Sequence, residues 1–393
     1  MGKTIVFAAC DSAPADKAKA DIICSGVNDE LLFNRAIADL VTGGTIQLLD
    51  GNYYIDSFPG KDNSAIYFGF NDGKARVINF IGDTENKSYN SHFGVVLHVT
   101  ETAFKSIDPD QEYRVFYGTP ELPESPGAFF TYTHINNVNF ENFYLYFFDA
   151  SKPLIGLDCR NFGSTFIKLV GIYTEKYFEC RFMHIKPQTP CKGTIGLYSC
   201  PGSNDEMARV GFEFLNIGGL HTGMYINRMD HLVMQACSTC RCVYGYVFDG
   251  TPKTMTMINC CDEGNRHLPR FLAPRHTHEK DGHITMIDFN IERFNADFIP
   301  DDPDGDDEAC AIEVIPNSWH GSISYTLQGK AFGIKSFWKN GHGRNVRTIN
   351  LNHDRISRPE NPEYLTSYFD TRSNRMLIWN GSDWVDTLGN IVL

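Results

Sequence analysis

Short apolar runs separated by polar turns occupy most of the chain. The runs are four to seven residues long and rich in Val, Ile, Met, Phe and Tyr, and Asn, Gly, Ser and Asp interrupt them. No apolar stripe with a 3.6-residue period is long enough to form a pair of packed helices. This pattern predicts an all-β chain built from many short strands rather than from helical repeats.

Two sets of these runs repeat along the chain. Three runs align on a shared methionine, at spacings of 23 and 29 residues: Met234, Met257 and Met286. In three others a glycine opens a short apolar run, at spacings of 27 and 22 residues: Gly196, Gly223 and Gly245. Periods of about 20 to 30 residues with one strand unit each are typical of solenoids. We therefore predict a parallel β-helix, in which each coil hydrogen-bonds to the next about 4.8 Å away.

Stacking of the coils makes residues from different repeats into neighbours. The methionine alignment predicts that Cys237 lies above Cys260 and Ser238 above Cys261, and that Glu263 lies above Glu292. The solenoid should also need caps, because an uncovered coil exposes a sheet edge.

A helix is predicted near the N-terminus, from Asp29 to Val41, with Asn28 as its cap and Gly43-Gly44 ending it. Its expected apolar face is Leu31, Leu32, Ala36, Ile37 and Leu40. This helix would cover the open end of the first coil.

Two polar insertions interrupt the strands, from Asp83 to Phe93 and from Glu101 to Gly127. Such insertions usually gather on one face of a solenoid and form its binding surface. Near the C-terminus, Asn380-Gly381 separates two apolar runs, which predicts a β-hairpin.

The composition of the 393 residues restricts the partners of the protein. A formal charge of −13 disfavours general affinity for nucleic acid or anionic membranes. No apolar run reaches the length of a membrane span, and no signal segment is present. We therefore expect cytoplasmic synthesis, with the 12 cysteines present as thiols.

Both ends of the chain resemble known proteins. Thr4–Ala13, Lys19–Glu30 and Gly43–Ile55 resemble the opening of right-handed parallel β-helix proteins of the pectate-lyase-like superfamily. Asp370-Thr371, Trp379-Asn380-Gly381 and Trp384-Val385-Asp386 are similar to small terminal hairpins of bacteriophage tail-spike and tail-fibre proteins.

The resemblance implies a right-handed, single-stranded β-helix that forms a homotrimer, binds a polysaccharide or oligosaccharide, and is assembled into a phage particle. The implied organisation is an N-terminal cap in residues 1–56, the β-helix in 57–357 and a hairpin tail in 358–393.

The strongest candidate for chemistry is a pair of carboxylates. Glu263 and Glu292 would start about 4.8 Å apart on successive coils, close to the separation of roughly 5 to 5.5 Å used by retaining glycosidases. Like charges this close cannot both ionise freely, so one would keep a proton and act as an acid. Asp262 and Asp288 lie nearby in the chain. The alternative is a ladder of solvated acids at a turn.

Five further residues are candidate substrate contacts because they lie near the acid pair in the repeat: Asp230, His231, Arg241, His267 and His283.

Two segments have the composition of metal sites, but each has a structural alternative. Cys237, Cys240, Cys242, Cys260 and Cys261 could form a zinc site or fill the interior as stacked thiols, and we favour the stack. Asp301–Glu308 holds six carboxylates in eight residues and could bind calcium or form a solvated acidic loop. We expect no metal in the acid site.

These features predict a carbohydrate-active protein that cleaves or rearranges glycosidic bonds. A tail-spike-like depolymerase, acting as hydrolase or lyase, and a fructotransferase-like transglycosylase both fit the paired acids. The other classes are a non-catalytic glycan-binding adhesin and a structural phage tail fibre component.

Overall fold

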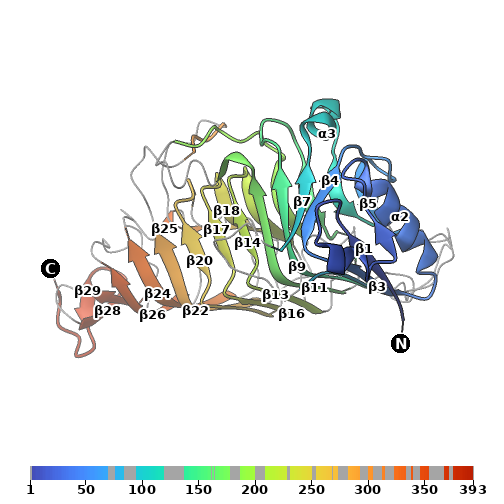
Figure 1. The fold of residues 1–393 in the computed structure, drawn as a ribbon. Helices are drawn as coiled ribbons and strands as arrows, with labels where there is room; N and C mark the ends of the chain where they lie inside the picture. Colours follow the sequence, from blue (N-terminus) through green and yellow to red (C-terminus); the bar gives the residue numbers. More distant parts are fainter. Residues whose placement is uncertain are drawn as a thin grey trace, which may run out of the picture.

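Parallel β-strands make up most of the protein in a computed structural model, with three short helices among the described residues (Figure 1). The structure describes residues 2–69, 76–83, 94–118, 137–160, 162, 164–177, 186–199, 209–227, 231–249, 254–267, 269–272, 282–292, 300–303, 312–314, 323–332, 338–339, 346–353, 367–370 and 375–392. The helices are α1 (Pro14–Lys17), α2 (Asp29–Asp39) and α3 (Glu101–Ser106).

The strands form two sheets, a large one of 20 described strands and a second one of nine. The large sheet contains β1 (Lys3–Ala8), β2 (Ile22–Ile23), β3 (Gly44–Leu48), β4 (Gly51–Ile55), β6 (Val77–Gly82), β7 (Val95–Val99), β9 (Asn137–Phe147), β11 (Ser164–Thr174), β13 (Arg209–Glu213), β14 (Asn216–Gly218), β16 (His231–Gln235), β17 (Ser238–Cys240), β19 (Thr254–Ile258), β20 (Cys261–Glu263), β22 (Gly282–Glu292), β24 (Ile323–Phe332), β26 (Val346–His353), β27 (Ser367–Asp370), β28 (Arg375–Trp379) and β29 (Trp384–Asp386). The second sheet contains β5 (Ser64–Tyr67), β8 (Arg114–Tyr117), β10 (Ile155–Asp158), β12 (Ile195–Ser199), β15 (Thr222–Asn227), β18 (Tyr244–Asp249), β21 (Arg270–Leu272), β23 (Ile312–Val314) and β25 (Trp338–Lys339).

Strands from successive repeats lie side by side in chain order, from the N-terminal to the C-terminal end of the molecule (Figure 1). In β16, β19 and β22, Met234 pairs with Met257 and Met257 with Met286, which confirms the predicted alignment. The predicted partners Glu263 and Glu292 are also register partners, on β20 and β22.

The large sheet bends at one position of each repeat. The bend residues all have positive φ angles: Asn142, Leu169, Phe214, Ala236 and Asn259. Parallel pairing resumes on both sides of the bend, for example between β13 and β16 before it and between β14 and β17 after it. A left-handed residue turns the chain sharply, at a cost for side chains other than Gly and Asn. Each of these repeats therefore contributes two segments to the large sheet. We call the segment before the bend residue the first part of the sheet and the segment after it the second part.

The repeated glycines lie where the second sheet packs closely against the large one. A Cβ atom at Gly196 would lie 2.5 Å from Ile217 Cγ2 and 2.9 Å from the Gly223 carbonyl oxygen. At Gly223 it would lie 2.8 Å from Thr239 Cγ2 and 2.6 Å from the Gly245 carbonyl oxygen. The glycine repeat in the sequence therefore marks a column with no room for a side chain.

The interior between the sheets changes in character along the molecule. Near the N-terminal end it is filled by phenylalanine rings with centroids 5.1 to 6.4 Å apart, such as Phe68, Phe80 and Phe116. Further along the chain it contains Met234, Met257 and Met286 together with stacked thiols. Flexible methionines fill irregular space well, and here they pack beside fewer rings, such as Tyr246 and Phe289 with centroids 5.9 Å apart.

Helix α2 begins at the predicted residue and ends two residues early, at Asp39. Two details of the prediction are wrong. Asn28 occupies the cap position in a left-handed conformation, and its side chain caps nothing. Leu31 is 49% exposed, whereas Phe33 is buried against other core rings.

Carboxylates anchor α2 in place of the predicted cap. Asp29 accepts hydrogen bonds from the backbone N–H groups of Gly26 (3.2 Å) and Tyr54 (3.0 Å). Glu30 accepts from the N–H of Asp56 (3.2 Å) and the hydroxyl of Ser57. The helix is thereby tied to β4 and to the residues that follow it.

The C-terminal hairpin is confirmed, because β28 and β29 pair antiparallel with Trp379 opposite Trp384. Asn380 Oδ1 accepts from the N–H groups of Ser382 (2.9 Å) and Asp383 (2.7 Å) within the turn. The second predicted insertion is partly wrong, since it contains α3 and strand β8 of the second sheet. Residues 84–93 and 119–127 of the two insertions lie outside the described residues.

We expect Gly196→Ala to lower the free energy of unfolding by about 1 to 3 kcal/mol, because overpacking forces side chains or backbone to shift. Gly211→Ala is the matched control. A Cβ there would meet only the ring of Phe166, at 3.0 Å, and that side chain is exposed and can move. Urea denaturation of both variants is the measurement, and equal stabilities would contradict the close approach of the sheets.

Buried carboxyls at the start of α2 predict a pH-dependent contribution to stability. Burial raises the pKa of Asp29 above its ordinary value of 3.8, despite the hydrogen bonds from Tyr54 and Gly26. The folded state then binds this proton more tightly than the unfolded state does. Proton binding therefore stabilises the folded state at low pH, and this stabilisation is lost as the pH rises through the raised pKa. Asn mimics the protonated form. The stability of the natural protein minus that of Asp29→Asn should therefore fall as the pH rises from about 4 to 7.

Glu30→Gln should behave in the same way, since burial also raises the pKa of Glu30. Denaturation curves at a series of pH values provide the test. A stability difference that stays constant or increases with pH would contradict it.

Candidate functional site

One column of register partners crosses the second part of the large sheet on its outer face. Its members come from β4, β7, β9, β11, β14, β17, β20 and β22: Tyr54, His98, Tyr146, Tyr173, Gly218, Cys240, Glu263 and Glu292. Their sequence neighbours, such as Ile55, Leu97 and Leu145, belong to the core. Since side chains alternate along a strand, the column faces away from the core. We call it the aromatic-acidic column.

Stacked rings form the first half of this column. Tyr54 stacks on His98 with centroids 5.3 Å apart, and His98 on Tyr146 at 5.7 Å. The series continues from Tyr146 to Tyr173 at 6.0 Å and from Tyr173 to Tyr177 at 4.8 Å. Burial raises the pKa of Tyr146, so its hydroxyl stays neutral over the physiological range.

Tyr177 extends the stack over a gap in the column. A Cβ atom at Gly218 would lie 2.4 Å from Tyr177 Cε2, so the tyrosine ring occupies the space that a side chain at this position would take. Tyr177 and Cys240 belong to the same buried outer cluster. The buried aromatic cluster therefore reaches Cys240 on β17, the strand that precedes the strand of Glu263.

A hydrogen-bond chain fixes the orientation of His98. Asn52 Nδ2 donates to Asp11 Oδ2 at 2.6 Å, which leaves Asn52 Oδ1 to accept from His98 Nε2 at 2.9 Å. Nε2 is therefore the protonated nitrogen of the neutral ring. Nδ1 lies 3.6 Å from Glu175 Oε1, and burial raises the pKa of this glutamate.

The acid pair follows the rings in the column, whose register continues to Phe332 on β24. Glu263 on β20 is half-buried, and its register partner on the neighbouring strand is Glu292. The side chain of Glu292 lies outside the described residues. Neighbouring strands are about 4.8 Å apart, so the two carboxyl groups start from adjacent backbone positions.

Asp262 is on the opposite face of β20. It is fully buried, and a Cβ atom at Gly245 would lie 2.8 Å from its Oδ2. The interior there is polar, because Asn265 Nδ2 donates to Thr239 Oγ1 at 2.9 Å. The side chains of Asp262 and Glu263 therefore lie on opposite faces of β20. Asp288 lies in β22, and its side chain is outside the described residues.

The two histidines of the repeat lie on the other side of the bend from the acid pair. His231 is exposed at the start of β16, and His283 near the start of β22 shares its register partner Thr254. His283 precedes Glu292 by nine residues along β22, a distance of up to about 30 Å. The structure does not bring these histidines to the acids.

His267 is buried beside the second sheet. Its Nε2 lies 2.7 Å from Asp302 Oδ2, and its ring stacks on Tyr244 at 4.5 Å. The Tyr244 hydroxyl donates to the same oxygen at 3.3 Å. In this arrangement His267 and Asp302 hold segment 300–303 against the strands, and His267 is not at the outer column.

The predicted calcium segment is described only in part. Asp302 interacts with His267, and Asp301 forms an ion pair with Lys186 at 2.8 Å. Residues 304–308 lie outside the described residues, and so does Asp230, one of the predicted substrate contacts.

The cysteines of the repeat point in different directions. Cys237, Cys242 and Cys260 are part of the core, whereas Cys240 belongs to the outer cluster. Cys261 occupies an outer position beside Ser238. No group of three or more His, Cys, Asp or Glu side chains that could hold a metal ion occurs within the described residues.

Arg241 follows Cys240 at a second turn of the repeat. It is 4% exposed, and its backbone N–H donates to the Glu263 carbonyl oxygen at 3.1 Å. Of the predicted substrate contacts in the described residues, it is thus the one that lies directly beside the acid pair.

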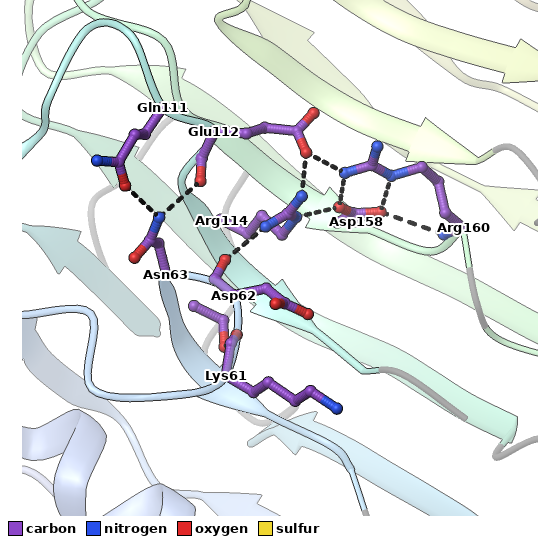
Figure 2. Close-up of polar contacts among 9 residues, drawn as sticks. Lys61, Asp62, Asn63, Gln111, Glu112, Arg114, Asp158 and Arg160 are labelled. Carbon is purple, nitrogen blue, oxygen red and sulfur yellow. Dashed lines mark hydrogen bonds and ion pairs between the residues drawn. The ribbon is translucent and has the colours of Figure 1, made fainter. Parts of the chain in front are cut away.

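A charged network on the second sheet was not predicted from the sequence (Figure 2). Arg114 Nε donates to Asp158 Oδ2 at 2.7 Å, and Arg160 Nε donates to Asp158 Oδ1 at 2.8 Å. Arg160 also donates to Glu112 Oε2 at 2.7 Å. Burial acts to lower the pKa of Arg160, but hydrogen bonds and the charges of Asp158 and Glu112 outweigh it and raise the pKa. Paired charges of this kind fix the strands in position.

Aromatic rings cover this network. The Arg114 guanidinium lies 4.5 Å from the ring centroid of Tyr117, and that of Arg160 lies 4.4 Å from Tyr198. Burial and the charge of Asp158 raise the pKa of Tyr117 to about 12. The sequence signal was weak, because these residues are far apart in the chain and meet only through the strand register.

Comparison with family models, curated proteins and solved structures gave no match. No helix among the described residues is long and apolar enough to cross a membrane. The function is therefore inferred from the geometry of the chain itself.

We expect Asp158→Asn to lower the free energy of unfolding by about 3 kcal/mol, because it removes the buried counter-charge of two largely buried guanidinium groups and leaves them only the more exposed Glu112. Glu101→Gln is the control. It breaks an exposed pair with Lys105, which is worth about 0.5 kcal/mol or less. Thermal and urea unfolding of both variants measure the difference, and a loss at Asp158 no larger than that of the control would contradict the assignment.

Proposed function

We propose that the chain is a right-handed parallel β-helix protein that binds a polysaccharide along the aromatic-acidic column and cleaves or rearranges glycosidic bonds with Glu263 and Glu292. The observation that carries this proposal is that the two glutamates are register partners in the same outer column as the stacked rings. Parallel pairing of successive repeats, the helix near the N-terminus and the terminal hairpin support the β-helix architecture.

The rings provide a binding surface for sugars. Tyr54 and His98 are half-buried, and their stacked rings are the part of the column's aromatic stack that remains partly accessible. Aromatic side chains offer both apolar area and a hydrogen-bonding group, which suits the apolar faces and hydroxyls of a sugar. Tyr146, Tyr173 and Tyr177 are only 3 to 6% exposed, so a bound sugar would contact Tyr54 and His98 rather than these buried rings.

The acids supply the chemistry of a retaining mechanism. One glutamic acid protonates the glycosidic oxygen as the bond to the anomeric carbon breaks, and the other carboxylate forms a glycosyl ester with that carbon. The first residue, now a carboxylate, then removes a proton from water or a sugar hydroxyl as it attacks. Water gives hydrolysis, and a sugar hydroxyl gives transglycosylation.

A second candidate is a non-catalytic glycan-binding adhesin or a structural component of a phage tail fibre. The partly accessible rings of Tyr54 and His98 favour it, because binding by rings requires no acid pair.

A homotrimer within a phage particle remains part of the proposal. Exposed apolar side chains on the first part of the large sheet support contact with another copy: Val77, Phe166 and Val233 on its strands, with Leu169 and Phe214 at the bend. Patches of this kind commonly mark protein interfaces.

We expect Glu263→Gln and Glu292→Gln each to reduce turnover of a cleaved polysaccharide by about 10² to 10⁴-fold, because each removes an acid or a nucleophile. Binding and thermal stability should change little. Glu213→Gln is the control, since Glu213 is a half-exposed strand residue that pairs with Lys168 outside the column. Full activity in either column variant would rule out the assigned pair.

Incubation with a panel of polysaccharides, followed by mass spectrometry of the products, separates the classes. Hydrated products indicate a hydrolase, unsaturated ones a lyase, and dehydrated cyclic ones an intramolecular transferase. Binding without any change in product mass indicates the adhesin.

A further inference from the structure

We propose that Arg241 forms a subsite for a small oxyanion, such as a carboxylate or sulfate substituent of the bound glycan, beside the acid pair. For its glycan ligand this inference rests on the proposed function. The anion site itself can be tested with inorganic ions alone.

Two nitrogens of the buried Arg241 guanidinium have no hydrogen-bond partner within the described residues. The residue is 4% exposed, and its Nε and Nη1 make no hydrogen bond with any group in the described parts of the chain. Burying a charge without a partner is costly, and arginines in protein interiors are normally paired. The fork of the guanidinium matches the geometry of carboxylate, sulfate and phosphate groups. An oxyanion would supply the missing acceptor.

The backbone at Arg241 is also unfavourable for an arginine. Its φ is 52°, in the left-handed region, whereas the corresponding positions in the preceding and following repeats are Gly219 (φ 75°) and Gly264 (φ 62°). The correspondence follows from the pairing of Cys240 with Gly218 and with Glu263. Glycine adopts this conformation without a steric cost. Folding would therefore favour glycine at position 241, and an unfavourable residue held in place suggests a functional role.

The position of Arg241 indicates what the anion belongs to. Its backbone N–H binds the carbonyl oxygen of Glu263, so the turn that carries the guanidinium is attached to the strand that carries one of the two acids. Because little of Arg241 reaches the surface, only a small group that penetrates beside the turn can contact Nε and Nη1. A substituent on a sugar ring fits this condition better than the backbone of a polyanion does.

Thermal unfolding of the full-length protein in sodium sulfate, sodium acetate and sodium chloride at equal ionic strength tests the proposal. Specific binding should raise the Tm of the natural protein along a saturating curve with at least one of the two oxyanions. The general effect of sulfate on protein stability is instead roughly the same in all variants. A response to acetate alone favours a carboxylate, and a response to sulfate alone favours a sulfate ester.

Arg241→Gly and Arg241→Met should lose the saturating response, and Arg241→Lys should weaken anion binding by about tenfold. Lys105→Met, which removes an exposed cation far along the chain from this turn, should keep the response. Without added oxyanion, Arg241→Gly should melt at the same temperature as the natural protein or higher, because it removes both the unpaired charge and the backbone strain.

Three results would overturn the inference: no saturating response in the natural protein, an equal response in Arg241→Gly, or a lower Tm of Arg241→Gly in chloride alone, which would make Arg241 a structural residue. A saturating, Arg241-dependent response in a protein that cleaves no polysaccharide would uphold the anion subsite and count against the catalytic proposal. The anion subsite and the catalytic proposal can therefore be contradicted independently of each other.

Discussion

Parallel hydrogen bonding between successive repeats is the constraint on which the structure depends. It holds each strand about 4.8 Å from the next and fixes which residues become neighbours, as the pairing of Met234, Met257 and Met286 illustrates. Hydrogen bonds of the backbone do not depend on side-chain type. The same ladder can therefore carry phenylalanines inside one end of the molecule, methionines and thiols further along, and a changing series of rings, small residues and acids on its outer face.

The repeats and the register were predictable because they leave a direct mark on the sequence. The glycine column is visible in the sequence because only glycine fits there: a Cβ atom at Gly196 or Gly223 would collide with the facing sheet. The methionine alignment gave the partners of β16, β19 and β22, and with them the pairing of Glu263 with Glu292. The hairpin at Asn380 was predictable for the same reason, because its turn requires particular residues.

Contacts that depend on side-chain direction were harder to predict. Asp262 and Glu263 are adjacent in the sequence, yet the alternation along β20 places the first in the interior and the second on the outer face. The aromatic stack was missed because its rings come from repeats whose lengths differ too much to align by spacing. The cap of α2 was assigned to Asn28 by residue preference, whereas the buried carboxylates of Asp29 and Glu30 anchor the helix by contacts that no local pattern reveals.

The turn after the column can carry a side chain that packing would exclude from a strand. A turn residue is less constrained by packing than a strand residue, provided that it tolerates a positive φ. Gly219 and Gly264 meet this requirement without cost, and Arg241 does not. A buried arginine there makes the coil less stable while adding a strong hydrogen-bond donor next to Glu263. The ladder supplies rigid positions for the two glutamates. The stability of many stacked strands can offset the cost of one unfavourable turn. A small domain, with less stability to lose, could not tolerate such a residue.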